Sequence, residues 1–101
     1  MDRKQKLIEL LQEDPNDSFL NHALALELIK EGDDNKAREI FESILAREPS
    51  YVGSYYHLGK LLERAGQPAL ALEWYEKGMQ QCRMVKDMHA YNELQAAAED
   101  L

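Results

Sequence analysis

The chain repeats itself with a period of 34 residues. Pro15 and Pro49 are separated by that distance, as are Gly32 and Gly66. The same shift relates a further set of small and apolar residues: Ala37 to Ala71, Leu24 to Leu58, Leu28 to Leu62, Leu45 to Met79, and Leu7 through Phe41 to Tyr75. A fixed period of about 20 to 50 residues is typical of stacked repeats, in which each unit buries its apolar face against its neighbours.

Apolar residues within each repeat follow helical spacing, as Leu20, Leu24 and Leu28 show. The pattern predicts six helices, at about 2–13, 18–31, 34–47, 51–65, 68–82 and 86–100. The joints are short, so successive helices are expected to be antiparallel neighbours. Because no strand pattern appears, the predicted fold class is all-α.

Residues that end and begin helices lie at the joints. Gly32 and Gly66 can adopt the left-handed conformation that closes a helix, and Pro15 and Pro49 discourage helical angles in the residue before them. The candidates for starting the next helix are Ser18, Asp33, Asp34, Asn35, Ser50 and Pro68.

Gly59 stands inside an apolar helical run, where glycine costs about 1 kcal/mol relative to alanine. Its counterpart one period earlier is Ala25, which is also small. We expect small residues here to let paired helices approach closely, while large rings such as Tyr75 and Trp74 fill the neighbouring space. Gly59→Leu is therefore predicted to overpack the joint.

These residues resemble the tetratricopeptide repeat family, a helix–turn–helix unit of 34 residues. The second repeat carries the pattern most fully, with Tyr55, Leu58-Gly59, Leu62, Gly66, Ala71, Tyr75 and Gly78. The first repeat carries Leu24-Ala25, Leu28, Gly32, Ala37, Phe41, Ile44 and Pro49. Asn21 replaces the expected large aromatic residue, so looser packing is expected there.

The resemblance implies a right-handed α-solenoid of antiparallel helix pairs in a single domain, 1–101. Its expected parts are an N-terminal half-repeat at 2–15, repeats at 18–51 and 52–85, and a C-terminal capping helix at 86–101. The capping helix has Asn92-Glu93 where the family has Leu-Gly. The family resemblance also implies that the protein is a non-catalytic scaffold for protein–protein interaction.

Composition and charge exclude several other functions. The net charge of −7 disfavours nucleic acid, whose binding needs basic stripes. No apolar run approaches the roughly 18 residues of a membrane span, and no signal peptide appears, so a cytoplasmic protein is expected. Cys82 is the only cysteine, which prevents an internal disulfide. Arg83 beside it would lower the pKa of a reactive thiol, although an inert cysteine near a helix end is the simpler interpretation.

No catalytic, metal or cofactor site is predicted. The three histidines lack carboxylate or thiol partners at metal-site spacing. There is also no glycine-rich loop for phosphate and no histidine at helical spacing from Cys82.

The first helix of each repeat should line a concave groove. The residues expected to bind a partner there are Phe19, His22, Leu26, Ile29, Lys30, Tyr56, His57, Lys60, Arg64 and Tyr91. The first five belong to a helix that is apolar nearly all round, which is typical of burial.

Three explanations of that apolar helix remain open. The groove holds a peptide or helix of a partner protein, or it is covered in a homodimer, or the terminal helices fold over it. We favour the first, because aromatic side chains beside charged ones are typical of binding hot spots. Some members of the family grip the C-terminal carboxylate of chaperone tails with a clamp of lysine, asparagine and arginine, but that clamp is largely absent here.

Overall fold

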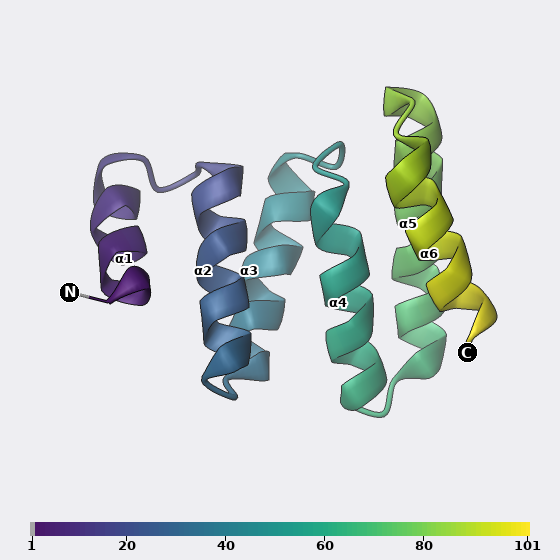
Figure 1. The fold of residues 1–101 in the computed structure, drawn as a ribbon, viewed down its shortest axis with the longest axis horizontal. Coiled ribbons are helices and arrows are strands. Elements are labelled where there is room, and N and C mark those ends of the chain that lie inside the picture. The colour runs from purple at the N-terminus through teal and green to yellow at the C-terminus, as the bar shows by residue number, and fades with distance from the viewer. Residues whose placement is uncertain (1) are drawn as a thin grey trace. The chain divides into compact units, whose positions relative to one another are not determined.

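A computed structural model describes residues 2–101 and contains six α-helices within them (Figure 1). These are α1 (Arg3–Glu13), α2 (Ser18–Lys30), α3 (Asp34–Arg47), α4 (Gly53–Arg64), α5 (Pro68–Val85) and α6 (Met88–Glu99). No strand occurs in the described residues. The all-α class and the number of helices predicted from the sequence are confirmed.

The chain forms two compact units, one ending at Glu48 and the other beginning at Pro49. Unit 1 contains α1, α2 and α3, and unit 2 contains α4, α5 and α6. Within each unit, every helix packs against the next along the chain, and in unit 2 the first and third helices also pack together.

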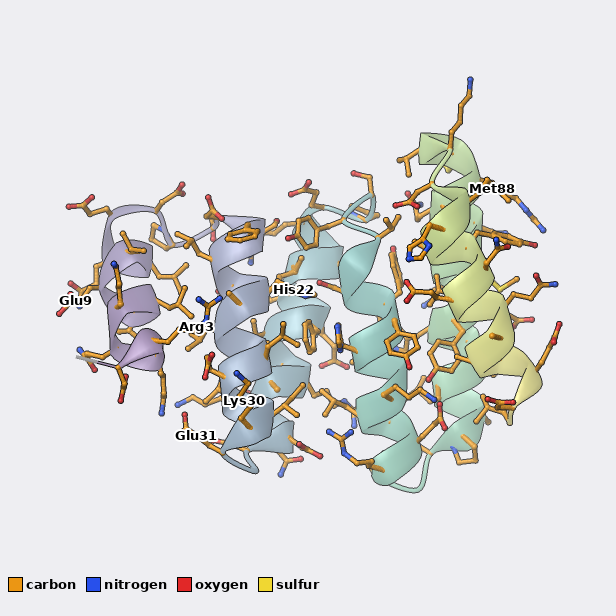
Figure 2. All side chains as sticks on the ribbon, viewed as in Figure 1. Arg3, Glu9, His22, Lys30, Glu31 and Met88 are labelled. Carbon is orange, nitrogen blue, oxygen red and sulfur yellow. The ribbon has the colours of Figure 1, made fainter. Side chains whose placement is uncertain are left out.

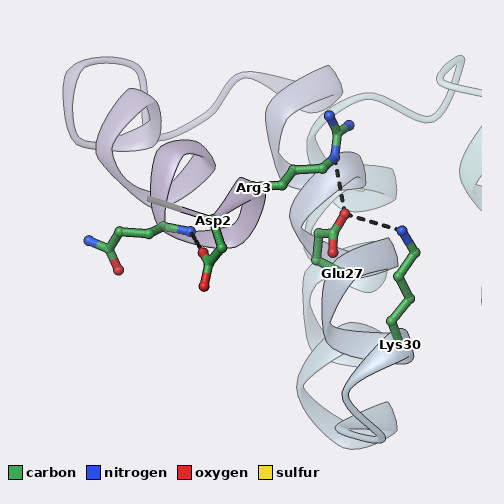
Figure 3. A network of polar contacts seen from close by, with 5 residues as sticks. Asp2, Arg3, Glu27 and Lys30 are labelled. Atoms are coloured by element: carbon green, nitrogen blue, oxygen red, sulfur yellow. Dashed lines mark hydrogen bonds and ion pairs between the residues drawn. The ribbon is translucent and has the colours of Figure 1, made fainter.

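Unit 1 is built around small residues of α2 and large residues of α3. Ala25 and Leu28 of α2 are buried, and so are Phe41 and Ile44 of α3. Leu7 is the one residue of α1 that is buried. Cross-helix ion pairs reinforce this thin contact. Arg3 Nε lies 3.0 Å from Glu27 Oε1 (Figure 3). Lys4 Nζ lies 3.1 Å from Glu31 Oε1.

Unit 2 has a larger core to which all three helices contribute. Its buried residues are Ser54, Tyr55, Leu58, Gly59, Leu61 and Leu62 of α4, Ala71, Tyr75, Gly78 and Cys82 of α5, and Leu94 and Ala97 of α6. Buried and exposed positions alternate with helical periodicity, so each helix turns one face inward. Most of the exposed residues of α6 are polar, with Met88 and Ala96 as the exceptions.

Gly59 permits the closest approach between α4 and α5. A Cβ atom at this position would fall on the ring of Tyr75, which is fully buried. The ring therefore occupies the space that any other residue would fill. The Tyr75 hydroxyl donates a hydrogen bond to the Glu63 carboxylate, one turn further along α4. Burial, followed by this carboxylate, raises the pKa of Tyr75 well above its ordinary value.

Gly78 plays the same part where the three helices of unit 2 meet. A Cβ atom there would lie 2.7 Å from Leu94 Cδ1 and 2.7 Å from Tyr55 Cβ. Both distances are far below van der Waals contact, and both neighbours are buried. Glycine at 78, where the family usually has alanine, thus lets α5 approach α4 and α6 together.

Three helices end in the same hydrogen-bonded turn. After α2, the Asp33 N–H donates to Leu28 O at 2.9 Å, and after α4 the Gln67 N–H donates to Leu62 O at 2.9 Å. Gly32 and Gly66 supply the positive φ angles, +84° and +76°, that this turn needs. After α5 the same turn is made without glycine.

The turn after α5 has Lys86 in the left-handed conformation, with φ of 64°. The Asp87 N–H donates to Cys82 O at 2.9 Å, as in the other two turns. This helix ends at Val85 rather than at 82 as predicted, because no glycine at an earlier position stops it. Lys86 adopts this positive φ although the steric strain from its Cβ destabilises the turn.

Aspartate starts four of the six helices. The carboxylates of Asp2, Asp17, Asp33 and Asp87 each accept a hydrogen bond from the backbone N–H three residues further on. An ionised acceptor also interacts favourably with the positive end of the helix dipole. The prediction for Asp33 and the placement of Pro68 in a first turn are confirmed.

The predicted serine caps are wrong. Ser18 is already inside α2, behind Asp17, and its hydroxyl donates to Glu48 Oε1 at 2.6 Å. Helix α4 begins at Gly53 instead of 51, after Val52, and has no side-chain cap, so Ser50 does not serve as one.

Asn21 and Tyr55, which occupy equivalent positions, bind equivalent backbone carbonyls. Tyr55 Oη donates to Pro49 O at 2.7 Å, and Asn21 Nδ2 donates to Pro15 O at 2.9 Å. Asn21 is half-buried and Tyr55 is buried, so both units keep the hydrogen bond and unit 1 lacks the packing of the ring.

Gly59→Ala should lower the free energy of unfolding by about 1 to 3 kcal/mol, although alanine is the better helix former. The collision with the Tyr75 ring is the reason. Chemical denaturation would measure the change. In a Tyr75→Leu background, which removes the ring, the same substitution should cost clearly less. An equal cost in both backgrounds would contradict this explanation.

Lys86→Gly should raise the free energy of unfolding by about 1 kcal/mol, because glycine adopts positive φ without a steric penalty. The matched control is Gly66→Lys, which imposes that penalty at the equivalent turn and should lower the same quantity by a similar amount. Thermal unfolding followed by circular dichroism measures both. Shifts of the same sign would be inconsistent with this account.

Candidate functional site: a groove between the first and third helices of unit 2

Two adjoining hollows lie between α4 and α6. One, of about 160 Å³, is lined by Val52, Gly53, Tyr56, His57, Ala90, Glu93 and Leu94. The other, of about 230 Å³, is lined by Tyr56, Lys60, Glu93, Ala96, Ala97 and Asp100. Tyr56 and Glu93 belong to both linings, so the hollows form one groove along the two helices. We call it the α4–α6 groove.

Helical spacing produces the two walls. Gly53, Tyr56, His57 and Lys60 are three or four residues apart and lie on one face of α4, whose opposite face carries buried Tyr55. The wall on α6 follows the same rule: its residues are Ala90, Glu93, Leu94, Ala96, Ala97 and Asp100. Half of this second wall is alanine, and such small side chains leave the space that the groove occupies.

The Tyr56 ring lies at the centre of the α4 wall. The His57 ring meets it edge-on, with centroids 5.6 Å apart and an interplanar angle of 86°. Lys60 Nζ lies 5.5 Å from the centroid of the Tyr56 ring and 3.5 Å from Glu63 Oε2. The lysine therefore interacts with an aromatic face and a carboxylate at once.

The charges of the groove are unequal. Burial lowers the pKa of His57 below its ordinary value, and the Glu93 carboxylate opposes that shift only in part. His57 is therefore neutral at pH 7. Lys60 is paired with Glu63, whereas Glu93 and Asp100 are exposed and negative. His89, one turn earlier on α6, approaches this carboxylate, with His89 Nε2 at 3.8 Å from Glu93 Oε1.

Five of the predicted binding residues belong to α2 in unit 1. Phe19 is 66% exposed, while Leu26 and Ile29 are half-buried. His22 also extends from α2 (Figure 2). Its ring meets the Phe41 ring edge-on, with 5.4 Å between centroids. Lys30 Nζ lies 3.4 Å from Glu27 Oε1, and the same carboxylate oxygen also binds Arg3 (Figure 3).

The five predicted residues of unit 2 fall into two groups. Tyr56, His57 and Lys60 line the α4–α6 groove. Arg64 is exposed at the C-terminal end of α4, outside both linings. Tyr91 lies beside α5: its hydroxyl accepts a hydrogen bond from Arg83 Nη2 at 2.8 Å, and the Arg83 guanidinium lies 5.1 Å from the centroid of its ring.

Sequence reasoning missed Glu93, Ala96, Ala97 and Asp100 as lining residues. The three- and four-residue spacing from Ala90 to Leu94 and Ala97 was a signal for this face of α6. Tyr91 is adjacent to it in sequence but points about 100° away around the helix.

Cys82 is fully buried in the last turn of α5, near a helix end as expected. Burial, followed by the charge of Asp87, raises the pKa of its thiol. The expectation that Arg83 would lower this pKa is wrong, since the Arg83 guanidinium is engaged by Tyr91. The thiol is thus protonated at neutral pH and shielded from solvent, which describes an unreactive cysteine.

Residues 2–101 contain neither a candidate metal site nor a candidate membrane span. No cluster of three or more His, Cys, Asp or Glu side chains is placed to hold a metal ion in this part of the chain. Among its helices, none combines the length and apolar character that crossing a membrane requires.

Known proteins provide a comparison for the whole arrangement. The protein-family model described as Tetratricopeptide repeat matches residues 52–81 of this chain. No curated protein matches the chain. Among solved structures, the crystal structure of a tetratricopeptide repeat domain protein from Salinibacter ruber is 37% identical, with a TM-score of 0.80 over 83% of this chain and 93% of that one.

Two other solved structures agree. A solution structure of a tetratricopeptide repeat domain protein from Salinibacter ruber is 38% identical, with a TM-score of 0.82 over 86% of this chain and 88% of that one. A protein from Bordetella parapertussis is 21% identical and shares the fold, with a TM-score of 0.83 over 99% of this chain and 87% of that one. The helical solenoid predicted from the sequence is the fold class of these proteins, and the chain belongs to the tetratricopeptide repeat family.

Proposed function

We propose that the protein docks a peptide or helical segment of a partner protein, and that the α4–α6 groove of unit 2 receives it. Proteins of this family generally mediate protein–protein interaction and are generally non-catalytic. The observation that carries the proposal is the groove itself, which has an aromatic centre and charged margins. A central aromatic side chain with polar groups around it is typical of sites where a few residues dominate binding.

The groove is suited to a chain segment rather than to a compact small molecule. It is open along two parallel walls that extend from Gly53 to Lys60 on α4 and from Ala90 to Asp100 on α6. Apolar contact would come from Tyr56 and the alanine wall, and orientation from His57 and Lys60.

The alternative is a homodimer that buries the apolar side of α2. Phe19 is the observation in its favour, because two-thirds of this large apolar side chain is exposed. Leu26 and Ile29, which are only half-buried, belong to the same helix. Covering them with a second copy would remove apolar surface from water. In this alternative Leu26 contributes to an interface between copies and not to a peptide site.

A photo-crosslinking amino acid at position 56 should give an adduct with a partner protein in lysate from the source cells. The matched control is the same amino acid at position 76, an exposed site on α5. Ala96→Trp adds a large ring to the exposed alanine of the groove wall and should abolish the adduct at 56. Equal crosslinking at 56 and 76, or an adduct unaffected by Ala96→Trp, would contradict docking in this groove.

The mass of the protein in solution tests the alternative. Docking as the primary function predicts the mass of one chain across a wide range of concentrations, measured by size-exclusion chromatography with light scattering. A homodimer predicts twice that mass, reduced to one chain by Leu26→Asp. The control Glu39→Gln, at an exposed position of α3, should leave the mass unchanged in both cases.

A further inference from the structure

The α4–α6 groove has a net negative lining although a lysine belongs to it. Glu93 and Asp100 are both exposed on the α6 wall, and α6 contains no lysine or arginine. On the α4 wall, Lys60 is the cation, and its ammonium group is already paired with Glu63 at 3.5 Å. The Lys60–Glu63 pair adds almost no net charge to the groove. The two carboxylates on the α6 wall therefore make the net charge of the groove negative.

The two carboxylates are separated by a distance that a partner must match. Glu93 and Asp100 are seven residues apart on one helix, which corresponds to about 10 Å along the axis. Between them the wall consists of Ala96 and Ala97, and Tyr56 faces this stretch from α4. An apolar floor with a carboxylate at each end suits the stems and charged ends of long cationic side chains.

We propose that the occupant of the groove is a basic segment of a partner protein, with two lysine or arginine side chains about 10 Å apart that reach Glu93 and Asp100. This inference rests on the proposed docking function and adds the charge and spacing of the ligand. In an extended segment that distance separates residues three positions apart, at about 3.1 Å per residue. Tyr56 and the alanine wall contact the side-chain stems, and the carboxylates accept hydrogen bonds from their charged ends.

The net charge of −7 assists such a ligand but does not define its site. A general attraction would act on any cationic peptide and would depend only on the total charge of the protein. The groove instead predicts dependence on two particular carboxylates. That difference makes the proposal testable with variants of equal net charge.

The test starts from a phage-displayed library of random twelve-residue peptides selected on the full chain. Selected peptides should be rich in lysine and arginine, with cations three residues apart. Synthetic copies are then measured by fluorescence anisotropy against the Glu93→Gln/Asp100→Asn variant, which keeps the shape of both side chains. Affinity should fall about tenfold, because a partly exposed ion pair contributes up to about a factor of five.

The matched control is Glu73→Gln/Glu76→Gln, which changes the net charge equally on α5, outside the groove. It should alter affinity by less than about twofold. Circular dichroism confirms that both variants retain their helices. If both variants weaken binding equally, the attraction is general and the inference is overturned.

Two other outcomes separate this inference from the proposed function. Peptides that lose binding with Ala96→Trp but not with Glu93→Gln/Asp100→Asn would leave docking in place and overturn the basic ligand. Peptides unaffected by either variant would overturn both. Glu93→Lys/Asp100→Lys provides the reciprocal test, because a groove of reversed sign should select acidic peptides from the same library.

Discussion

The packing of unit 2 depends on aromatic rings that lie directly against glycine backbone. Tyr75 occupies the place of a side chain at Gly59, and Tyr55 and Leu94 do the same at Gly78. A helix with glycine in its interior is weaker by itself. The close approach compensates, because the buried rings gain contact along their whole face. It also brings α4 and α6 to the same part of α5, where Tyr55 and Leu94 both meet Gly78, and the α4–α6 groove lies between these two helices.

The two repeats use different chemistry at equivalent positions. Tyr75 and its partner Glu63 in unit 2 correspond in the sequence to Phe41 and Ile29 in unit 1, so a polar pair in one repeat is replaced by an apolar pair in the other. The carbonyls of Pro15 and Pro49 likewise receive a hydrogen bond from an asparagine and from a tyrosine. The two repeats therefore share the geometry of their backbone, and different side chains make the contacts at equivalent positions.

Much of the fold could be predicted because its determinants are local. The 34-residue period, the glycine turns and the helical spacing each depend on residues close in sequence, and the structure confirms the helices that they indicate. The errors have local explanations too. Ser18 does not cap α2 because Asp17, a stronger acceptor, does so, and α4 begins at Gly53 without any side-chain cap. Helix α5 continues to Val85 because its closing turn is made by Lys86 and not by an earlier glycine.

The candidate site was less predictable, because it depends on the rotation of α6 relative to α4. Tyr56, His57 and Lys60 lie on the face that the sequence indicated. Tyr91 and Glu93 are two residues apart, yet one contacts α5 and the other lines the groove. A weakly patterned helix rich in alanine does not reveal which side it turns inward. Lys60 is also held by Glu63, a pairing that depends on the position of the side chains.

The turn after α2 has a consequence for how this chain can change over time. Asp33 takes part in both the end of α2 and the start of α3. Its N–H donates to the Leu28 carbonyl at the end of α2, and its carboxylate accepts from the Lys36 N–H at the start of α3. No residue therefore separates the two helix-ending interactions. Loss or gain of one residue there would swing the following helix by about 100° and carry Phe41 out of the interior. Lineages of this protein can therefore exchange side chains widely, while the number of residues between helices stays fixed.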